Sequence, residues 1–259
     1  MTWERQAKST RNPLAKVEAG RVRRYEREIL SSFDRVFAVS ADDREALMDL
    51  GIAGARVGIL PNIPDQRLLE AEPRLGFEGS APVVGYVGTL SWQPNIDGLR
   101  RFLTDVFPLV RERMADARFV MAGRGAPPKL EKLARRTRGV EFLGEVDDPE
   151  MVYRQARVIV EATRTGGGTK LKVLNAMARG LPVVASEEAA NGLEVSDGEN
   201  IIVARSDVLM AESVLRLMSD AELWGRLAEG GQALVRAKYI PDVAFRPLDE
   251  ALERQSGHG

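Results

Sequence analysis

The sequence predicts an α/β protein built on a doubly wound parallel sheet. Short runs rich in Val and Ile recur between residues 83 and 204, and stretches with helical spacing separate most of these runs. Such runs are typical of parallel strands that are covered by helices on both faces. Glycines directly follow several of the runs, so the backbone there can turn sharply or approach a ligand closely.

Strands are expected at 83–88, 117–123, 140–144, 157–162, 182–186 and 200–204. Helices are expected at about 95–113, 128–137 and 148–155, from the glycine run at 166–168 to Gly180, and at 206–218, 220–237 and 242–254. Because each crossover between parallel strands should be right-handed, helices should lie on both faces of the sheet. Residues 67–259 are therefore predicted to form a Rossmann-like domain.

The chain before this domain predicts a smaller α/β segment. A helical pattern begins near residue 14, and strands are expected at 34–40 and 56–62. Between them, Ser40 is a suitable N-cap and Gly51 a suitable end for a short helix. Two strands with exposed edges do not make an independent domain. Residues 1–66 are thus expected to be a partial segment with the start of a linker, whose Pro, Gly and charged residues continue to about residue 81.

Composition excludes several classes of function. The chain has 259 residues with 44% hydrophobic and 29% charged residues, a net charge of -1, no cysteine and one histidine, His258. Disulfides, thiolate metal sites and histidine-based catalysis are not expected, and no global field favours nucleic acid. The sequence shows neither an apolar run of about 20 residues nor a signal peptide, so a cytoplasmic location is expected. The basic first helix makes peripheral attachment to an anionic membrane the alternative.

Three glycine-containing loops should meet at the carboxyl edge of the sheet, where ligands of such folds bind. The first holds Gly88 and Thr89, and the second holds Arg124 between two glycines. The third precedes a helix and has the most informative pattern, with Gly166, Gly167, Gly168, Thr169 and Lys170.

A helix that begins after glycines presents free N–H groups and the positive end of its dipole, which suits phosphate. Lys170 in the first turn opposes that dipole, and a bound phosphate would explain it. The competing interpretation is a tight turn with an exposed lysine. A dinucleotide enzyme is disfavoured because "GRG" is an incomplete fingerprint and no acidic residue is placed to hold a ribose.

Four stretches in order resemble a known family: "GYVGTLSWQPNIDGLRRFL", "RFVMAGRG", "VEFLGEVDDPEMVYRQARVIVEATRTGGGTKLKVLNAMARGLPVVAS" and "AANGLEVSDGENIIVA". They are similar to the donor-binding half of the retaining GT-B glycosyltransferases of family 4, also called group 1. The residues before them resemble the end of the family's acceptor domain, of which only residues 1–62 would be represented.

The resemblance implies a nucleoside-diphosphate sugar as donor, bound in a cleft without a metal ion or other cofactor. Transfer would retain the anomeric configuration, and N–H groups and cations would stabilise the departing diphosphate. The donor-binding residues expected are Gly88, Thr89, Arg124, Gly166, Gly167, Gly168, Thr169, Lys170, Leu171 and Asn175. No residue is assigned as catalytic.

Two departures from the family pattern affect these residues. Many members carry an Arg and a Lys in the first loop, where this chain has Thr89 and either Pro94 or Asn95. Lys170 and Arg124 are expected to take their place. Many members also carry two glutamates at the positions of Gly167 and Asn175, of which the second touches the ribose. The neutral Asn175 would bind a ribose hydroxyl less strongly.

Two functions stay open at this point. The chain is expected to be a glycosyltransferase, or its donor-binding portion, that acts on an acceptor such as a polysaccharide or a lipid-linked glycan. The alternative is a non-catalytic nucleotide-binding module, or a half-enzyme that depends on a partner chain. The exposed edges of the first two strands favour a homo-oligomer or a partner that supplies the missing domain.

Overall fold

A computed structural model describes residues 13–71, 76–165 and 171–256. Its larger sheet contains six strands, all paired in parallel, in the spatial order β5-β4-β3-β6-β7-β8. Their bounds are β3 (Val83–Val87), β4 (Arg118–Ala122), β5 (Val140–Gly144), β6 (Val158–Glu161), β7 (Val183–Ser186) and β8 (Ile202–Ala204). The predicted doubly wound sheet is confirmed.

The order of the strands reverses between β3 and β6, which pair directly through Val84↔Val158 and Gly85↔Ile159. In sheets of this type the carboxyl ends of the two strands at the reversal flank a crevice, and ligands bind there. The strand order thus directs attention to the loops that follow β3 and β6.

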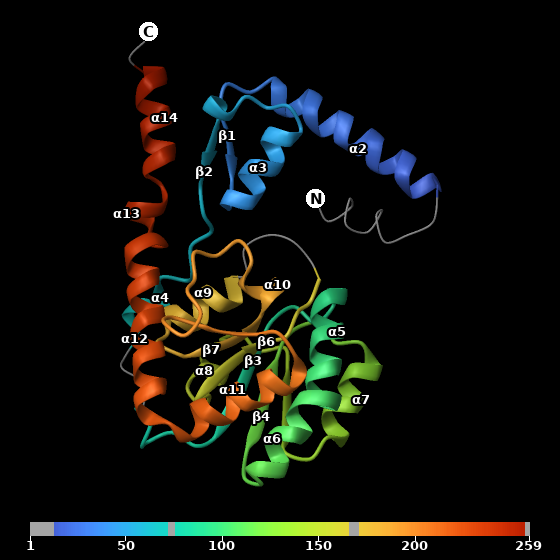
Figure 1. Cartoon of the computed structure of the whole chain (residues 1–259), viewed down its shortest axis with the longest axis vertical. Coiled ribbons are helices and arrows are strands. Elements are labelled where there is room, and N and C mark those ends of the chain that lie inside the picture. Colours follow the sequence, from blue (N-terminus) through green and yellow to red (C-terminus); the bar gives the residue numbers. More distant parts are fainter. Residues whose placement is uncertain (1–12, 72–75, 166–170, 257–259) are drawn as a thin grey trace.

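Helices cover both faces of this sheet (Figure 1). One face packs against α5 (Gln93–Arg101), α6 (Phe107–Arg113), α7 (Pro128–Arg136) and α11 (Asp207–Ser219). The other packs against α8 (Glu150–Tyr153) and α9 (Leu171–Ala178), while α12 (Ala221–Lys238) contributes its first half to the first core and its second half to the other. Side chains alternate along β6, so that Val158 and Val160 join the first core and Ile159 the second.

The single helix expected at 95–113 is interrupted by a π-helical turn, η2 (Phe102–Val106). Pro108 causes the interruption, because it has no N–H and its ring would collide with the carbonyl four residues earlier. The turn keeps Phe102 in the core, where its ring centroid lies 4.7 Å from that of Phe119.

The N-terminal residues form a separate two-stranded parallel sheet, seen above the larger sheet in Figure 1. Its elements are α2 (Pro13–Ser31), β1 (Val36–Ala38), α3 (Ala41–Asp49), the 3-10 turn η1 (Gly54–Arg56) and β2 (Val57–Ile59). Ser40 caps α3 as expected, with its side chain accepting from the Asp43 N–H, and Gly51 follows it at φ 95°. Within the described ranges β1 and β2 pair only with each other, and self-association stays a prediction.

The stretch expected to be a plain linker contains a helical turn, α4 (Arg67–Glu70). Its Leu68 is only 6% exposed and belongs to the core beneath α9. The linker interpretation was therefore wrong for these residues, because Leu68, an apolar side chain in a charged stretch, is buried in the core. The division at residue 66 stays a prediction.

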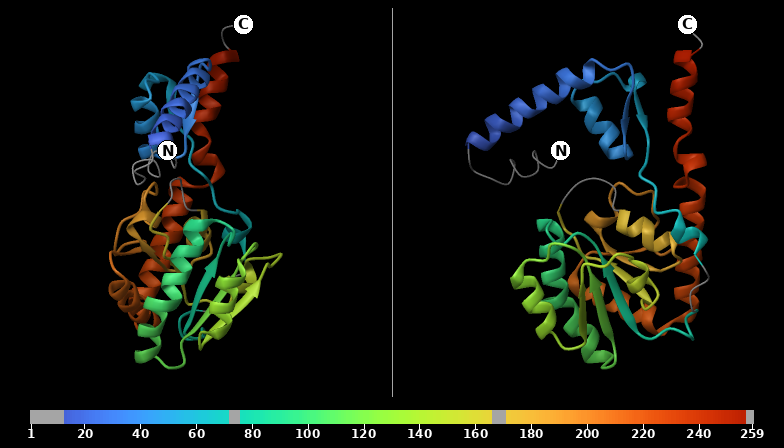
Figure 2. Two further views of the ribbon diagram at one scale, coloured as in Figure 1. Left: turned by 90° about the vertical axis from the view of Figure 1, so that its right-hand side faces the viewer. Right: turned by 180° about the vertical axis from the view of Figure 1, so that it is seen from behind.

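Two further elements differ from expectation. A short helix, α10 (Glu187–Ala190), follows β7 and was not predicted. The helix expected at 242–254 is divided into α13 (Pro241–Ala244) and α14 (Arg246–Ser256). Pro247 explains the division, since proline is tolerated in the first turn of a helix but not in its interior. In both views of Figure 2, α14 (red) lies beyond the larger sheet, at the level of the two-stranded sheet.

A buried arginine fastens the chain before β3 to the helices of the domain. The Arg157 guanidinium donates to the Met218 carbonyl at 2.7 Å and to the Phe77 carbonyl at 3.0 Å, and it stacks on the Phe77 ring at 4.2 Å. Burial lowers the pKa of Arg157, and the charges of Glu78 and Asp116 oppose that shift.

We expect Arg157→Met to lower the free energy of unfolding by about 3 kcal/mol, because it leaves buried carbonyls without donors. Urea denaturation would measure this, with the exposed Arg136→Met as the control. Equal urea midpoints for the two variants would contradict the expectation.

Candidate functional site

A cleft with a volume of about 880 Å³ lies at the carboxyl edge of the six-stranded sheet. The loops after β3, β4 and β5 form one side of it, and α8 and α9 form the other. Its walls include Gly88, Thr89, Arg124, Glu145, Tyr153 and Asn175. The cleft is thus adjacent to the strand reversal, where the fold predicts a ligand.

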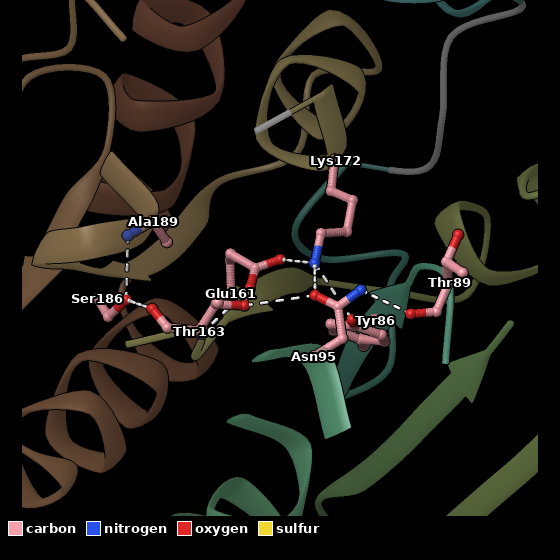
Figure 3. A network of polar contacts seen from close by, with 8 residues as sticks. All are labelled: Tyr86, Thr89, Asn95, Glu161, Thr163, Lys172, Ser186 and Ala189. Carbon is pink, nitrogen blue, oxygen red and sulfur yellow. Dashed lines mark hydrogen bonds and ion pairs between the residues drawn. The ribbon is translucent and has the colours of Figure 1, made fainter. Parts of the chain in front are cut away.

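A buried polar network joins the loops at this edge (Figure 3). Lys172, in the first turn of α9, forms an ion pair with Glu161 at the end of β6. Its ammonium also donates to the Asn95 side-chain oxygen at 2.8 Å and to the Tyr86 hydroxyl at 3.2 Å. Lys172 itself lines the cleft, so this network connects the cleft to the sheet.

Glu161 is the most deeply buried member of the network. Its side chain is 2% exposed, against 21% for that of Lys172. One carboxylate oxygen accepts from both the N–H, at 3.1 Å, and the hydroxyl of Thr163, and the Thr163 carbonyl in turn accepts from Ser186. Because a buried carboxylate is costly without partners, these contacts explain how an acid is tolerated in an apolar strand.

Asn95 connects the network to the loop after β3. Its side-chain oxygen faces Lys172, so its amide nitrogen is free to donate to the Thr89 carbonyl, at 2.6 Å. Gly88 leaves room for this arrangement, since a Cβ there would lie 2.7 Å from the Tyr86 hydroxyl and 2.9 Å from the Lys172 Cδ. Burial raises the pKa of Tyr86 well above its usual value, and the Glu161 charge adds to the rise.

Asn175, one helical turn beyond Lys172, joins the cleft to the chain before the domain. Its side-chain oxygen accepts from the Asp65 N–H at 3.0 Å. Burial raises the pKa of the neighbouring Tyr153, the Glu150 charge adds to the rise, and a hydrogen bond with Asn175 opposes it. Because an amide oxygen can accept two hydrogen bonds and its nitrogen can donate two, Asn175 keeps one acceptor site and one N–H for a ligand.

Five of the residues predicted to bind a donor line this one cleft: Gly88, Thr89, Arg124, Leu171 and Asn175. The other five, Gly166, Gly167, Gly168, Thr169 and Lys170, lie outside the described residues. That any of these residues binds a donor stays a prediction.

Sequence reasoning missed Lys172 and Glu161, and it treated Asn95 only as a position without a cation. Two signals could have found them. Glu161 is an acid inside the apolar run "VIVEA", and Lys172 opposes the dipole of α9 as Lys170 would.

Two features are absent from the described part of the chain. No group of three or more His, Cys, Asp or Glu side chains there is arranged to hold a metal ion. None of the helices in the same ranges is long and apolar enough to cross a membrane.

A six-stranded sheet in this order, with a cleft at its reversal, is the architecture of a Rossmann-like domain. Residues 81–220 match the family model described as "Glycosyl transferases group 1". Since that match covers more than half of the chain, the chain belongs to the group 1 glycosyltransferases, as the sequence resemblance indicated.

Curated relatives agree with this family. An alpha-D-kanosaminyltransferase of Streptomyces kanamyceticus is 31% identical over 189 residues, which are 70% of this chain and 47% of the relative. A GDP-mannose-dependent mannosyltransferase of Corynebacterium glutamicum is 26% identical over 196 residues, or 70% of this chain and 50% of the relative. The chain thus spans about half the length of the curated relatives that it matches.

The solved structure of HepE from Anabaena, in complex with UDP and glucose, has the same fold. It superposes with a TM-score of 0.70 at 16% identity, over 89% of this chain and 66% of that one. At this level of identity the likeness shows the fold alone.

Proposed function

We propose that this chain binds a nucleoside-diphosphate sugar in the cleft and serves as the donor-binding portion of a retaining glycosyltransferase. The observation that carries the proposal is the position of the cleft, at the strand reversal of a group 1 glycosyltransferase domain, with Lys172 in its wall. The names of two similar proteins, a GDP-mannose-dependent enzyme and one bound to UDP and glucose, support the class of donor.

The residues around the cleft suit the parts of such a donor. Lys172 and Arg124 are the basic side chains in its described wall, and the Arg124 guanidinium has no recorded partner there. They would face the diphosphate, whose growing negative charge is what has to be stabilised as the sugar departs. Asn175, Tyr153 and Glu145 also line the cleft and would face the nucleoside.

No metal ion is part of this proposal. The cations and N–H donors of the chain would stabilise the leaving diphosphate, so binding should be the same with and without EDTA. The acceptor would approach from the side of the two-stranded sheet, and a polysaccharide or a lipid-linked glycan is the class that we propose.

A second candidate is a nucleotide-binding half-enzyme that needs a partner chain for transfer. It is favoured by the two-stranded sheet, whose strands pair only with each other within the described ranges and so leave edges for a partner. The two candidates agree on donor binding and differ only in whether the chain transfers sugar alone.

We expect one nucleoside diphosphate, UDP or GDP, to stabilise the chain by about 2.7 kcal/mol when present at a hundred times its dissociation constant. A thermal-shift series with UDP, GDP, ADP and CMP measures this, with the matching nucleosides as controls and EDTA in half of the samples. If no nucleoside diphosphate stabilises the chain at millimolar concentration, donor binding is refuted. If one does stabilise it, an assay of sugar transfer by the chain alone decides between the two candidates.

A further inference from the structure

Helix α9 carries a buried ion pair at each end, and the two pairs differ in their relation to the helix dipole. Arg179, just after the helix, pairs with Glu150 at 2.8 Å, and the two side chains are 6% and 13% exposed. A cation at this end is favoured by the dipole, whereas Lys172 in the first turn is opposed by it. The charge of Lys172 therefore needs a counter-charge, which Glu161 supplies. The charge of Arg179 is already favoured by the dipole and needs Glu150 less.

The Lys172 ammonium donates hydrogen bonds to Asn95 and Tyr86 and forms an ion pair with Glu161. Of the two charged side chains in the network, Lys172 alone can be reached from the cleft, because Glu161 is almost completely buried. A ligand in the cleft would thus meet a cation with a negative charge directly behind it.

We propose that Glu161 is a positioning residue that tethers Lys172 and weakens its attraction for the diphosphate of the donor, so that the nucleoside diphosphate can leave after transfer. This inference rests on the function proposed above. Its physical reason is that the buried carboxylate repels the phosphates and cancels part of the attraction exerted by the ammonium. Water screens this repulsion little, because Glu161 is buried.

A purely structural role for the pair leads to the opposite expectation. If Glu161 only neutralised Lys172 so that Asn95 could hold the Thr89 loop, removing its charge would loosen the loop. Affinity for a nucleoside diphosphate would then fall or stay the same. The sign of the change therefore distinguishes the two roles.

The test is Glu161→Gln, which removes the charge and keeps a side-chain oxygen as acceptor for Thr163. We expect the variant to bind UDP or GDP, whichever binds the unaltered chain, about fivefold more tightly. Affinity for uridine or guanosine should not change, because these ligands carry no phosphate. The affinity for the diphosphate should also fall more steeply with salt than in the unaltered chain.

Three further variants complete the test, all measured by calorimetry. Glu161→Met also removes the charge and serves if Glu161→Gln does not fold. Glu161→Asp keeps the charge and should bind within twofold of the unaltered chain. Glu141→Gln removes a carboxylate that pairs with Arg118 at the start of β4, on the edge of the sheet opposite the cleft, and should leave the affinity unaltered.

Unchanged or weaker diphosphate binding in folded Glu161→Gln or Glu161→Met overturns the inference, as does an equal gain for the nucleoside. Failure of the proposed function is recognised separately, because in that case the unaltered chain itself binds no nucleoside diphosphate.

Discussion

Replacing Lys172 with methionine should abolish measurable binding of nucleoside diphosphates and lower the free energy of unfolding by about 3 kcal/mol. Binding is lost because the cleft loses a cation and keeps the buried negative charge of Glu161. Stability is lost because removal of one partner leaves a carboxylate that is only 2% exposed without its counter-charge. Calorimetry with UDP and GDP measures the first effect, and urea denaturation measures the second.

A double variant separates these two effects. Lys172→Met combined with Glu161→Gln no longer buries an unpaired charge, so we expect it to regain most of the lost stability but not the binding. Arg136→Met, on the exposed face of α7, controls for the loss of a positive charge. Normal diphosphate affinity in Lys172→Met would show that Lys172 does not face the ligand.

Replacing Gly123 with alanine should lower stability by about 3 kcal/mol and weaken nucleotide binding at least tenfold. Gly123 follows β4, and a Cβ there would overlap the Gly88 carbonyl oxygen and lie 2.9 Å from the Leu90 Cγ. Backbone hydrogen bonds hold the loops after β3 and β4 together at this point. The Gly88 N–H donates to the Ala122 carbonyl at 3.1 Å, and the Leu90 N–H donates to the Arg124 carbonyl at 2.8 Å. A methyl group would force apart the loops that form one wall of the cleft.

Gly225→Ala is the matched control for this steric effect. Gly225 lies inside α12, and a Cβ there would meet nothing within 4 Å. This variant should be more stable than the unaltered chain, by about 0.4–1 kcal/mol, because alanine restricts the unfolded chain. If Gly123→Ala has the urea midpoint and the nucleotide affinity of the unaltered chain, the loops have room to separate and the steric account is wrong.

The elements that the sequence predicts well are those whose signal is local. The run from Val158 to Val160 is apolar throughout and forms a strand that is buried on both faces. Ser40 and Gly51 mark the ends of α3 through hydrogen bonding and backbone freedom that belong to single residues. By contrast, Leu68 in a charged stretch gave no periodic pattern, so its helical turn and its place in the core were missed.

The candidate site was predicted in outline only. Glycine-containing loops at strand ends correctly indicated the carboxyl edge of the sheet, and Gly88, Thr89, Arg124 and Asn175 do meet in one cleft. The sequence predicted basic residues at Arg124, which lines the cleft, and at Lys170, which lies outside the described residues. The local pattern marked Lys172 only as a second cation that opposes the helix dipole, and its contact with Glu161 could not be read from the sequence.

By itself, then, the sequence determined the class of fold, the positions of the strands and the edge of the sheet that holds the cleft. These follow from periods of 2 and 3.6 residues and from single turn residues, which act over a few positions of the chain. Only the tertiary structure decided that Lys172 meets Asn95, 77 residues away, and the buried end of β6. That meeting requires β3 and β6 to be neighbours, and the order of strands is settled by packing of whole helices and strands rather than by local pattern.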